Sequence, residues 1–295
     1  MLTDSEIRLD LALFKDDVRR SHDQVQADLS QIVRYPGLEM THPSNVANHQ
    51  RLVTHIAHSA ASIWSETMGI SVDIQPSTVL RMSRHHDDHE ADPLIGDIPT
   101  SLKEVMTEDE VISLKEREVQ ANLRLAKFYG LAEGSVEYQQ FLKEKHDLDT
   151  LATPEAECTK AADLLHATWE VFHECLSGNV SFLPVAERYR ARSAKLAERS
   201  PIWNTLRHHP DIQLDDAHFP TPEQLLRMPR ITKTQVDTVD AEVYETWEEF
   251  ENIMNNPNFP VWYRKGFEIT SLEFGIHNLA QVIFPTWKKS FYTDA

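Results

Sequence analysis

The 295-residue sequence predicts an all-α fold. Three observations support this prediction. Glycine is scarce, at 8 residues, long amphipathic segments dominate the chain, and proline, glycine and capping residues mark where those segments begin and end. With 41% hydrophobic residues, a chain of this length holds enough apolar material for one large domain or two small ones.

The first predicted helix covers residues 4–33 and ends before a turn at Pro36-Gly37. A second helix runs from a cap at Ser44 or Asn45 to about residue 68, and it carries the clearest apolar stripe of the chain, formed by Leu52, Val53, Ile56, Ala57, Ala60, Ile63 and Trp64. His49 lies in the same stripe. A histidine on an apolar face is usually a satisfied core residue, but this one also points inward, where a metal could be bound.

A third helix is predicted to start at Pro76. At 3.6 residues per turn, one of its faces carries Val79, Ser83, His86 and Glu90, with Asp87 at the edge. The other direction is taken by His85, Asp88 and His89. The first face offers an imidazole and two carboxylates, which suit a metal site with a proton-handling acid beside it. A solvated, charge-rich helix end explains the same composition.

Local signals place the next helices. Thr107 and Glu110 form a capping box for a helix to about residue 128, and a shorter helix covers about 135–146. Thr153-Pro154-Glu155 begins a helix that runs to Gly178, and a further helix runs from residue 184 to about 199. Asp163 falls opposite the apolar side of its helix. Taken alone it is a solvent-facing aspartate, unless that helix is buried on both faces.

Residues 200–270 are rich in proline and aromatic side chains and contain no recognisable chemical motif, with short helices predicted at about 222–228 and 238–255. A last helix is predicted at about 271–291. Several of its aromatic side chains are expected to lie on the surface, where they suit a subunit interface. We therefore expect a homo-oligomer.

Net charge and cysteine content limit the binding partners and the cellular compartment that we expect. The net charge of −18 argues against binding to a nucleic-acid polymer, although a metal or a local arginine can still attract a small anion. Cys158 and Cys175 lie too far apart on one predicted helix to pair, which favours a reduced compartment. The N-terminus does not resemble a signal peptide, and no stretch approaches the roughly 18 apolar residues of a membrane span. We therefore expect a cytoplasmic protein without membrane contact.

Five short motifs appear in order along the chain: Arg34-Tyr35-Pro36, Asn45 to His49, His86-Asp87 with Glu90, Gly96 to Thr100, and Lys160 to Asp163. Their order and spacing resemble those of the HD-domain 5'-deoxynucleotidases, within the HD phosphohydrolases, over roughly residues 15–195. The resemblance implies an HD-domain helical bundle in residues 1–199, an insertion or extension of unknown role in 200–270, and a closing helix in 271–295 that packs back on the bundle. Two departures affect substrate preference: two extra residues precede Gly96-Asp97, and a tyrosine at position 35 stands where the family usually shows tryptophan.

The resemblance also implies roles for individual residues. One divalent ion (Co, Mn, Zn, Fe or Ni) would be bound by His49, His86, Asp87 and Asp163. The catalytic acids would be Glu90 and Asp97, and the substrate would contact Arg34, Tyr35, Thr100 and Lys160. Without the family context, Tyr35 is a core tyrosine and Lys160 a helix-surface lysine. A second metal could involve His85, His89, His208 or His209, but a histidine-rich surface is the commoner explanation.

The implied function is metal-dependent hydrolysis of deoxynucleoside 5'-monophosphates to deoxynucleoside and phosphate. Two alternatives stay open: a dNTP triphosphohydrolase, for example one acting on purine dNTPs, and a non-catalytic HD module that binds nucleotide. Retention of Glu90 and Asp97 argues against the last, because binding alone does not require them.

Overall fold

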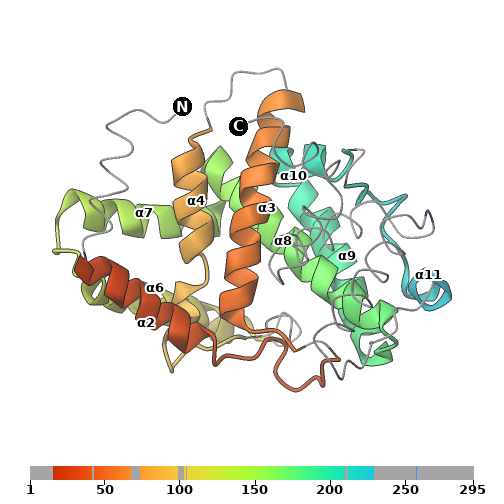
Figure 1. The fold of residues 1–295 in the computed structure, drawn as a ribbon, viewed down its shortest axis with the longest axis horizontal. Coiled ribbons are helices and arrows are strands. Elements are labelled where there is room, and N and C mark those ends of the chain that lie inside the picture. The colour runs from red at the N-terminus through yellow and green to blue at the C-terminus, as the bar shows by residue number, and fades with distance from the viewer. Residues whose placement is uncertain are drawn as a thin grey trace, which may run out of the picture. The chain divides into compact units, whose positions relative to one another are not determined.

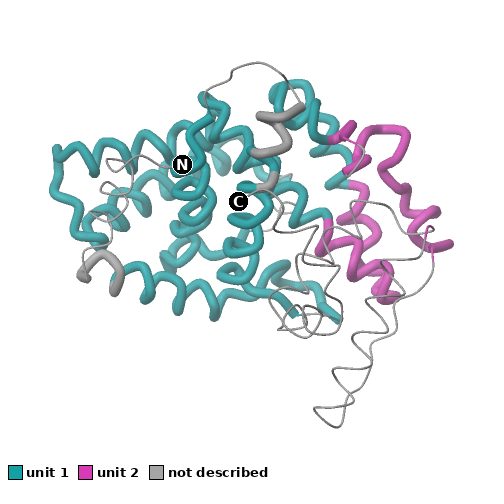
Figure 2. Tube along the Cα trace, turned by 45° about the horizontal axis from the view of Figure 1, so that its top comes forward, with its two compact units in different colours: residues 1–168, 188–206 teal, residues 169–187, 207–295 magenta. Residues whose placement is uncertain are grey.

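The computed structural model describes residues 16–41, 43–67, 74–98, 103, 105–209, 212–228 and 257. All regular elements in these ranges are helices, which confirms the predicted all-α class (Figure 1). Thr100, the helix predicted at 238–255 and the closing helix predicted at 271–291 lie outside the described residues. The chain divides into two compact units, residues 1–168 with 188–206, and residues 169–187 with 207–295 (Figure 2).

The first unit begins with α2 (Asp16–Leu29) and α3 (Val46–Thr67). The loop between them is closed by an isolated antiparallel bridge between Val33 and Asn45. Within this loop Tyr35 has a φ of 55°, a left-handed conformation that is uncommon for a residue with a side chain. Such a conformation needs support from surrounding contacts. One of these is a hydrogen bond from the Tyr35 amide to Asp97, described with the metal centre.

Helix α4 (Pro76–His85) starts at the predicted proline and packs beside α3 (Figure 1). It is shorter than predicted, because the α-helix ends at His85 and a 3₁₀-helix, η1 (Asp88–Ala91), follows. Asp87 between them has φ −108° and ψ 9°, outside the helical region. The expected continuous helical face through Glu90 is therefore wrong, and a turn divides it.

Helices α6 (Glu108–Phe128), α7 (Val136–Thr150) and α8 (Pro154–Leu176) follow. The capping box at the start of α6 is confirmed: the Thr107 side chain accepts a hydrogen bond from the Glu110 amide, and the Glu110 side chain accepts one from the Thr107 amide. A core cluster joins α2, α3 and α6 through Val25, Leu29, Val46, Leu125 and Tyr129. This cluster packs α3, which carries His49, against α2 and α6.

Helix α9 (Leu183–Ala197) is followed by α10 (Pro201–Leu206), which was not predicted. Residues 201–206 belong to the first unit, and α10 packs against α3. Trp203 is fully buried, and its indole N–H donates to the Ser193 carbonyl at 2.9 Å. The proline that opens α10 therefore begins a short packed helix, not an irregular segment.

The second unit contains η2 (Val180–Phe182) and α11 (Pro222–Arg227), the latter matching the helix predicted at 222–228. Its aromatic rings include Phe172 and Phe219 in an edge-on contact at 5.3 Å between centroids. Among the helices of the described residues, none combines the length and apolar composition needed to cross a bilayer.

Candidate metal centre

Four side chains from three helical segments converge in the first unit. His49 comes from α3, His86 and Asp87 from the end of α4, and Asp163 from α8. The His49 Nε2 atom lies 3.2 Å from Asp163 Oδ1, 3.4 Å from His86 Nε2 and 3.5 Å from Asp87 Oδ2. His86 Nε2 lies 3.0 Å from the same Asp87 oxygen. Residues far apart in the sequence are therefore brought together: His49, His86 and Asp87 form a compact group, and Asp163 joins it through His49.

These separations fit a bound divalent ion. Nitrogen and oxygen ligands lie about 2.0–2.2 Å from ions such as zinc, so ligand atoms that share one ion are about 3.0–3.5 Å apart. The four separations given above, 3.0–3.5 Å, fall in this range. A mixed set of two imidazoles and two carboxylates also suits first-row transition metals. The residues present are consequently compatible with one such ion.

Hydrogen bonds orient both imidazoles so that their Nε2 atoms face the cluster. The Nδ1 atom of His86 donates to the Ser83 carbonyl at 2.7 Å, which turns Nε2 toward the cluster. The Nδ1 atom of His49 lies 2.7 Å from Nδ1 of His166, which is buried on α8. His166 was not predicted as a site residue. Its position three residues after Asp163 places both on one helical face, which is the signal that could have identified it.

The environment keeps both carboxylates ionised. Burial opposes ionisation of Asp87, but His86 beside it outweighs burial and holds the pKa of Asp87 well below its usual range. Burial opposes ionisation of Asp163 too, and Lys160 outweighs it, so the pKa of Asp163 is also strongly lowered. The Lys160 Nζ donates to Asp163 Oδ2 at 2.6 Å. Lys160 was predicted as a substrate residue, and its contact in the structure is with the carboxylate of Asp163.

Asp163 does not face bulk solvent. Ala161 and Ala162, the two residues before it, are fully buried, and the Asp163 side chain is 16% exposed. From the sequence, Asp163 could face the interior only if this part of α8 was buried on both faces. The structure meets that condition. The idea of a solvated helix end is likewise wrong for the His86 region, because His86, Asp88 and Glu90 are all buried.

Glu90, the first residue predicted as a catalytic acid, is buried beside the cluster. Burial, with Asp87 and Asp97 nearby, raises the pKa of Glu90 well above its usual value. Among the described residues its Oε2 atom has no hydrogen-bond partner. This setting favours the protonated form of the carboxyl group, which is the form that can donate a proton.

Asp97, the second predicted acid, connects the cluster to the loop before α3. Burial raises its pKa, while Arg34 nearby opposes the shift. Its Oδ2 accepts a hydrogen bond from the Tyr35 amide at 3.1 Å, and this contact stabilises the left-handed backbone of Tyr35. Asp97 thus positions the loop that carries Arg34.

Arg34 and Tyr35 are both buried. The Arg34 guanidinium lies over the Tyr35 ring, 5.2 Å from its centroid, and acts electrostatically on His49, Glu90 and Asp97. The Tyr35 hydroxyl donates to the Ala167 carbonyl at 3.4 Å and lies 3.5 Å from the Tyr189 hydroxyl. Arg34 is therefore placed close to the reactive groups, whereas the contacts of Tyr35 are those of a core residue.

Four histidines were considered for a second metal. His89, His208 and His209 belong to none of the metal-compatible clusters found among the described residues. His85 does belong to such a cluster, together with His22 and Asp88, on the side away from His86.

Comparisons with known proteins agree with this geometry. Residues 24–202, more than half of the chain, match the family described as 5'-deoxynucleotidase YfbR-like. A 5'-deoxynucleotidase of Vibrio vulnificus is 26% identical over 192 residues, covering 64% of this chain and 94% of that protein. One of Vibrio parahaemolyticus is 25% identical over 202 residues, with the same coverage of 64% and 94%.

A solved structure also matches the fold. The HD-domain phosphohydrolase of Listeria innocua superposes with a TM-score of 0.52 at 24% identity, covering 71% of this chain and 96% of that one. The helical architecture is therefore that of an HD domain. Together with the family match over residues 24–202, this shows that the chain belongs to the YfbR-like 5'-deoxynucleotidase family.

Proposed function

We propose that this chain hydrolyses deoxynucleoside 5'-monophosphates to deoxynucleoside and phosphate, with one divalent ion held by His49, His86, Asp87 and Asp163. The observation that carries the proposal is the spacing of 3.0–3.5 Å between these donor atoms, next to a buried Glu90 with a raised pKa. The family and the two Vibrio relatives named as 5'-deoxynucleotidases support the substrate class. The ion is one of Co, Mn, Zn, Fe or Ni.

When bound, the ion supplies charge neutralisation at the phosphate and lowers the pKa of a water molecule. The chain's own residues do the rest. Arg34 pairs with the phosphate through its planar guanidinium, and Asp97 holds the Arg34 loop in place through the Tyr35 amide. Glu90, whose pKa is raised by burial, donates its proton to the departing 5' oxygen as the phosphorus–oxygen bond breaks and the bond to the attacking water forms. The Glu90 carboxylate left by this transfer then takes up the proton that the attacking water loses, so the residue ends the cycle protonated.

Glu90 also bears on the alternatives. A module that only binds nucleotide gains nothing from a buried carboxyl group whose Oε2 has no partner among the described residues, because such a group costs stability. The triphosphohydrolase alternative uses the same cluster and differs in product. Cytoplasmic location and homo-oligomerisation stay predictions of the sequence.

The test is a product analysis with metal-reconstituted protein. Deoxynucleoside 5'-monophosphates, ribonucleoside 5'-monophosphates and dNTPs are supplied separately with Co²⁺ or Mn²⁺. We expect phosphate and deoxynucleoside from the first set, and loss of that activity in Asp163→Asn. Asp109→Asn, an exposed aspartate on α6, is the matched control that keeps activity. Tripolyphosphate from dNTPs as the main product, or full activity in Asp163→Asn, would contradict the proposal.

A further inference from the structure

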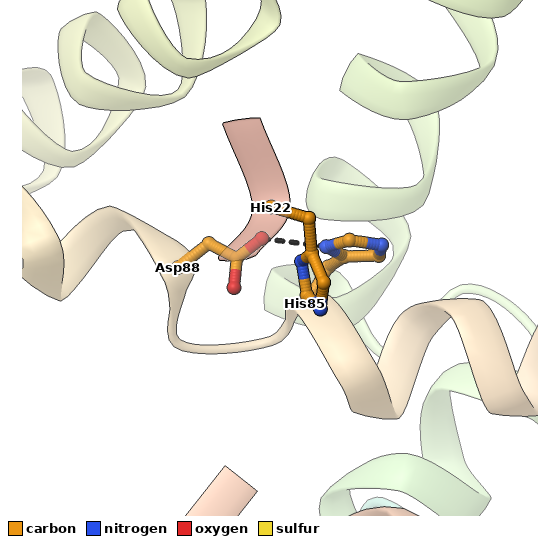
Figure 3. Close-up of side chains that lie close together, drawn as sticks. All are labelled: His22, His85 and Asp88. Carbon is orange, nitrogen blue, oxygen red and sulfur yellow. Dashed lines mark hydrogen bonds and ion pairs between the residues drawn. The ribbon is translucent and has the colours of Figure 1, made fainter. Parts of the chain in front are cut away.

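A second cluster of metal-ligating side chains lies on the opposite side of the His85–Asp88 segment from the metal centre. Figure 3 shows His22 from α2, His85 from the end of α4 and Asp88 from η1 pointing toward one another. One potential ligand atom from each residue lies within 4.8 Å of the other two. The two imidazole rings meet edge-on with centroids 5.0 Å apart, and His85 Nδ1 lies 2.6 Å from Asp88 Oδ2.

Adjacent residues of one short segment serve the two clusters. His86 and Asp87 turn toward His49, whereas His85 and Asp88 turn toward α2. The second cluster therefore uses none of the residues assigned to the proposed catalytic centre, and it does not depend on the proposed nucleotidase activity.

Asp88 is a fully buried carboxylate whose two oxygens each accept a hydrogen bond from a different part of the first unit. Its Oδ1 accepts from Gln50 Nε2 at 2.7 Å, and its Oδ2 accepts from the Tyr129 hydroxyl at 2.6 Å. Gln50 is itself held by Gln26, whose Nε2 donates to Gln50 Oε1 at 2.9 Å. Carboxylates that ligate metals are oriented by such outer contacts. Lys145 donates to the His85 carbonyl, on the backbone side of the cluster.

His22 presents a neutral imidazole to the cluster. Burial, with His85 nearby, lowers the pKa of His22 to about 4, so the ring is uncharged at neutral pH. Its Nδ1 atom is buried and has no hydrogen-bond partner among the described residues. A buried polar atom without a partner is costly, and a ligand that accepts the imidazole lone pair removes that cost.

We propose that His22, His85 and Asp88 form a second, structural site for a divalent cation of the zinc class. The cation lies between His85 Nδ1 and Asp88 Oδ2, which move apart from 2.6 Å to about 3 Å, the spacing of neighbouring ligands. Two imidazoles and one carboxylate leave a fourth position for water, and the His85 side chain, 27% exposed, gives access to solvent. The bound cation links α2 to the segment that carries His86 and Asp87.

Metal counting tests the site directly. Apoprotein is loaded with Zn²⁺, desalted and analysed for zinc per chain. We expect two equivalents in the wild type and one in His22→Gln. His58→Gln, which removes an exposed histidine of α3, is the matched control and keeps two. Asp163→Asn disables the proposed catalytic centre, so it keeps the equivalent at the second site, and the double variant His22→Gln/Asp163→Asn binds none.

The cause of any loss can be separated from misfolding. His22 is only partly buried, so His22→Gln is expected to fold, as circular dichroism would verify. In the Asp163→Asn background, Zn²⁺ should raise the Tm, and this rise should vanish when His22→Gln is added. Tyr129→Phe removes a hydrogen bond to Asp88 and should weaken Zn²⁺ binding at this site by about 10–100-fold. The same zinc content in the wild type and in His22→Gln, or in Asp163→Asn and in the double variant, overturns the proposal, whatever the phosphate-release assay shows.

Discussion

Replacing Lys160 by methionine distinguishes two roles for this residue. The family resemblance assigns Lys160 to the substrate, whereas in the structure its Nζ donates to Asp163 Oδ2 at 2.6 Å. The other carboxylate oxygen, Oδ1, lies 3.2 Å from His49 Nε2 at the metal cluster. Lys160 therefore holds one oxygen of Asp163 so that the other faces the cluster. Its loss should weaken metal binding and leave substrate binding intact.

The expected size of the effect follows from the exposure of the pair. Loss of an outer contact to a metal ligand typically costs about 10–100-fold in metal affinity. The Lys160 side chain is 41% exposed, so solvent screens its charge and the lower end of that range applies. We expect an affinity about tenfold weaker, equivalent to roughly 1.4 kcal/mol.

The assay is phosphate release as a function of Co²⁺ or Mn²⁺ concentration, with calorimetry of metal binding as an independent measurement. The half-saturating metal concentration should rise about tenfold in Lys160→Met, and the KM for deoxynucleotide at saturating metal should stay unchanged. Lys127→Met, at an exposed position of α6, is the control. An unchanged metal affinity combined with a raised KM would refute this reasoning. It would show instead that Lys160 binds the phosphate of the substrate.

Three further outcomes are expected. His166→Phe keeps a ring but removes the nitrogen that faces His49, so metal affinity should fall by about 10–100-fold in a calorimetric titration, and unchanged affinity would contradict the positioning role. Glu90→Gln should lower kcat by about 10²–10⁴-fold while metal content is kept. The raised pKa of Glu90 means that the folded protein binds its proton more tightly than the unfolded chain, so its stabilising contribution is complete below about pH 4.5 and is lost as pH rises. The Glu90→Gln apoprotein should therefore exceed the wild type in Tm at pH 8 but not at pH 4, and the reverse order would disprove the assigned pKa direction. Trp203→Ala should lower the unfolding free energy by about 3–5 kcal/mol in urea, because the ring is fully buried, and a loss below 1 kcal/mol would show that α10 is not part of the packed unit.

Helix starts were predictable because their signals are local. Thr107 with Glu110 and Thr153 with Pro154 satisfy backbone groups within a few residues, so the sequence alone determines them. The end of α4 at His85 has no such signal, since neither proline nor glycine follows until position 93. The break at Asp87 arises instead from contacts with α2, α3 and α6, which a helical count cannot include.

The site residues divide in the same way. His49 was predictable as inward-facing because it shares the apolar stripe of α3. Asp163 could be placed only through family resemblance, because its helix looks one-sided in sequence and its second buried face is created by tertiary packing. The helical count placed Asp88 only on the side away from His86, and the structure alone shows that it is buried and that Gln50 and Tyr129 compensate its burial. His22 was missed, although it shares a helical face with Val25 and Leu29 at i, i+3 and i+7.

The alternation of directions along residues 85–88 has a consequence for variation in this part of the chain. The side toward which each side chain points depends on how many residues separate it from the end of α4. Inserting or deleting one residue would therefore turn Asp88 or His85 to the side that His86 and Asp87 now occupy. Point replacements in this stretch alter one cluster at a time, but a change in its length scrambles both at once. We therefore expect homologous chains to vary in the residues at positions 85 and 88. The number of residues between Ser83 and Glu90 should be preserved.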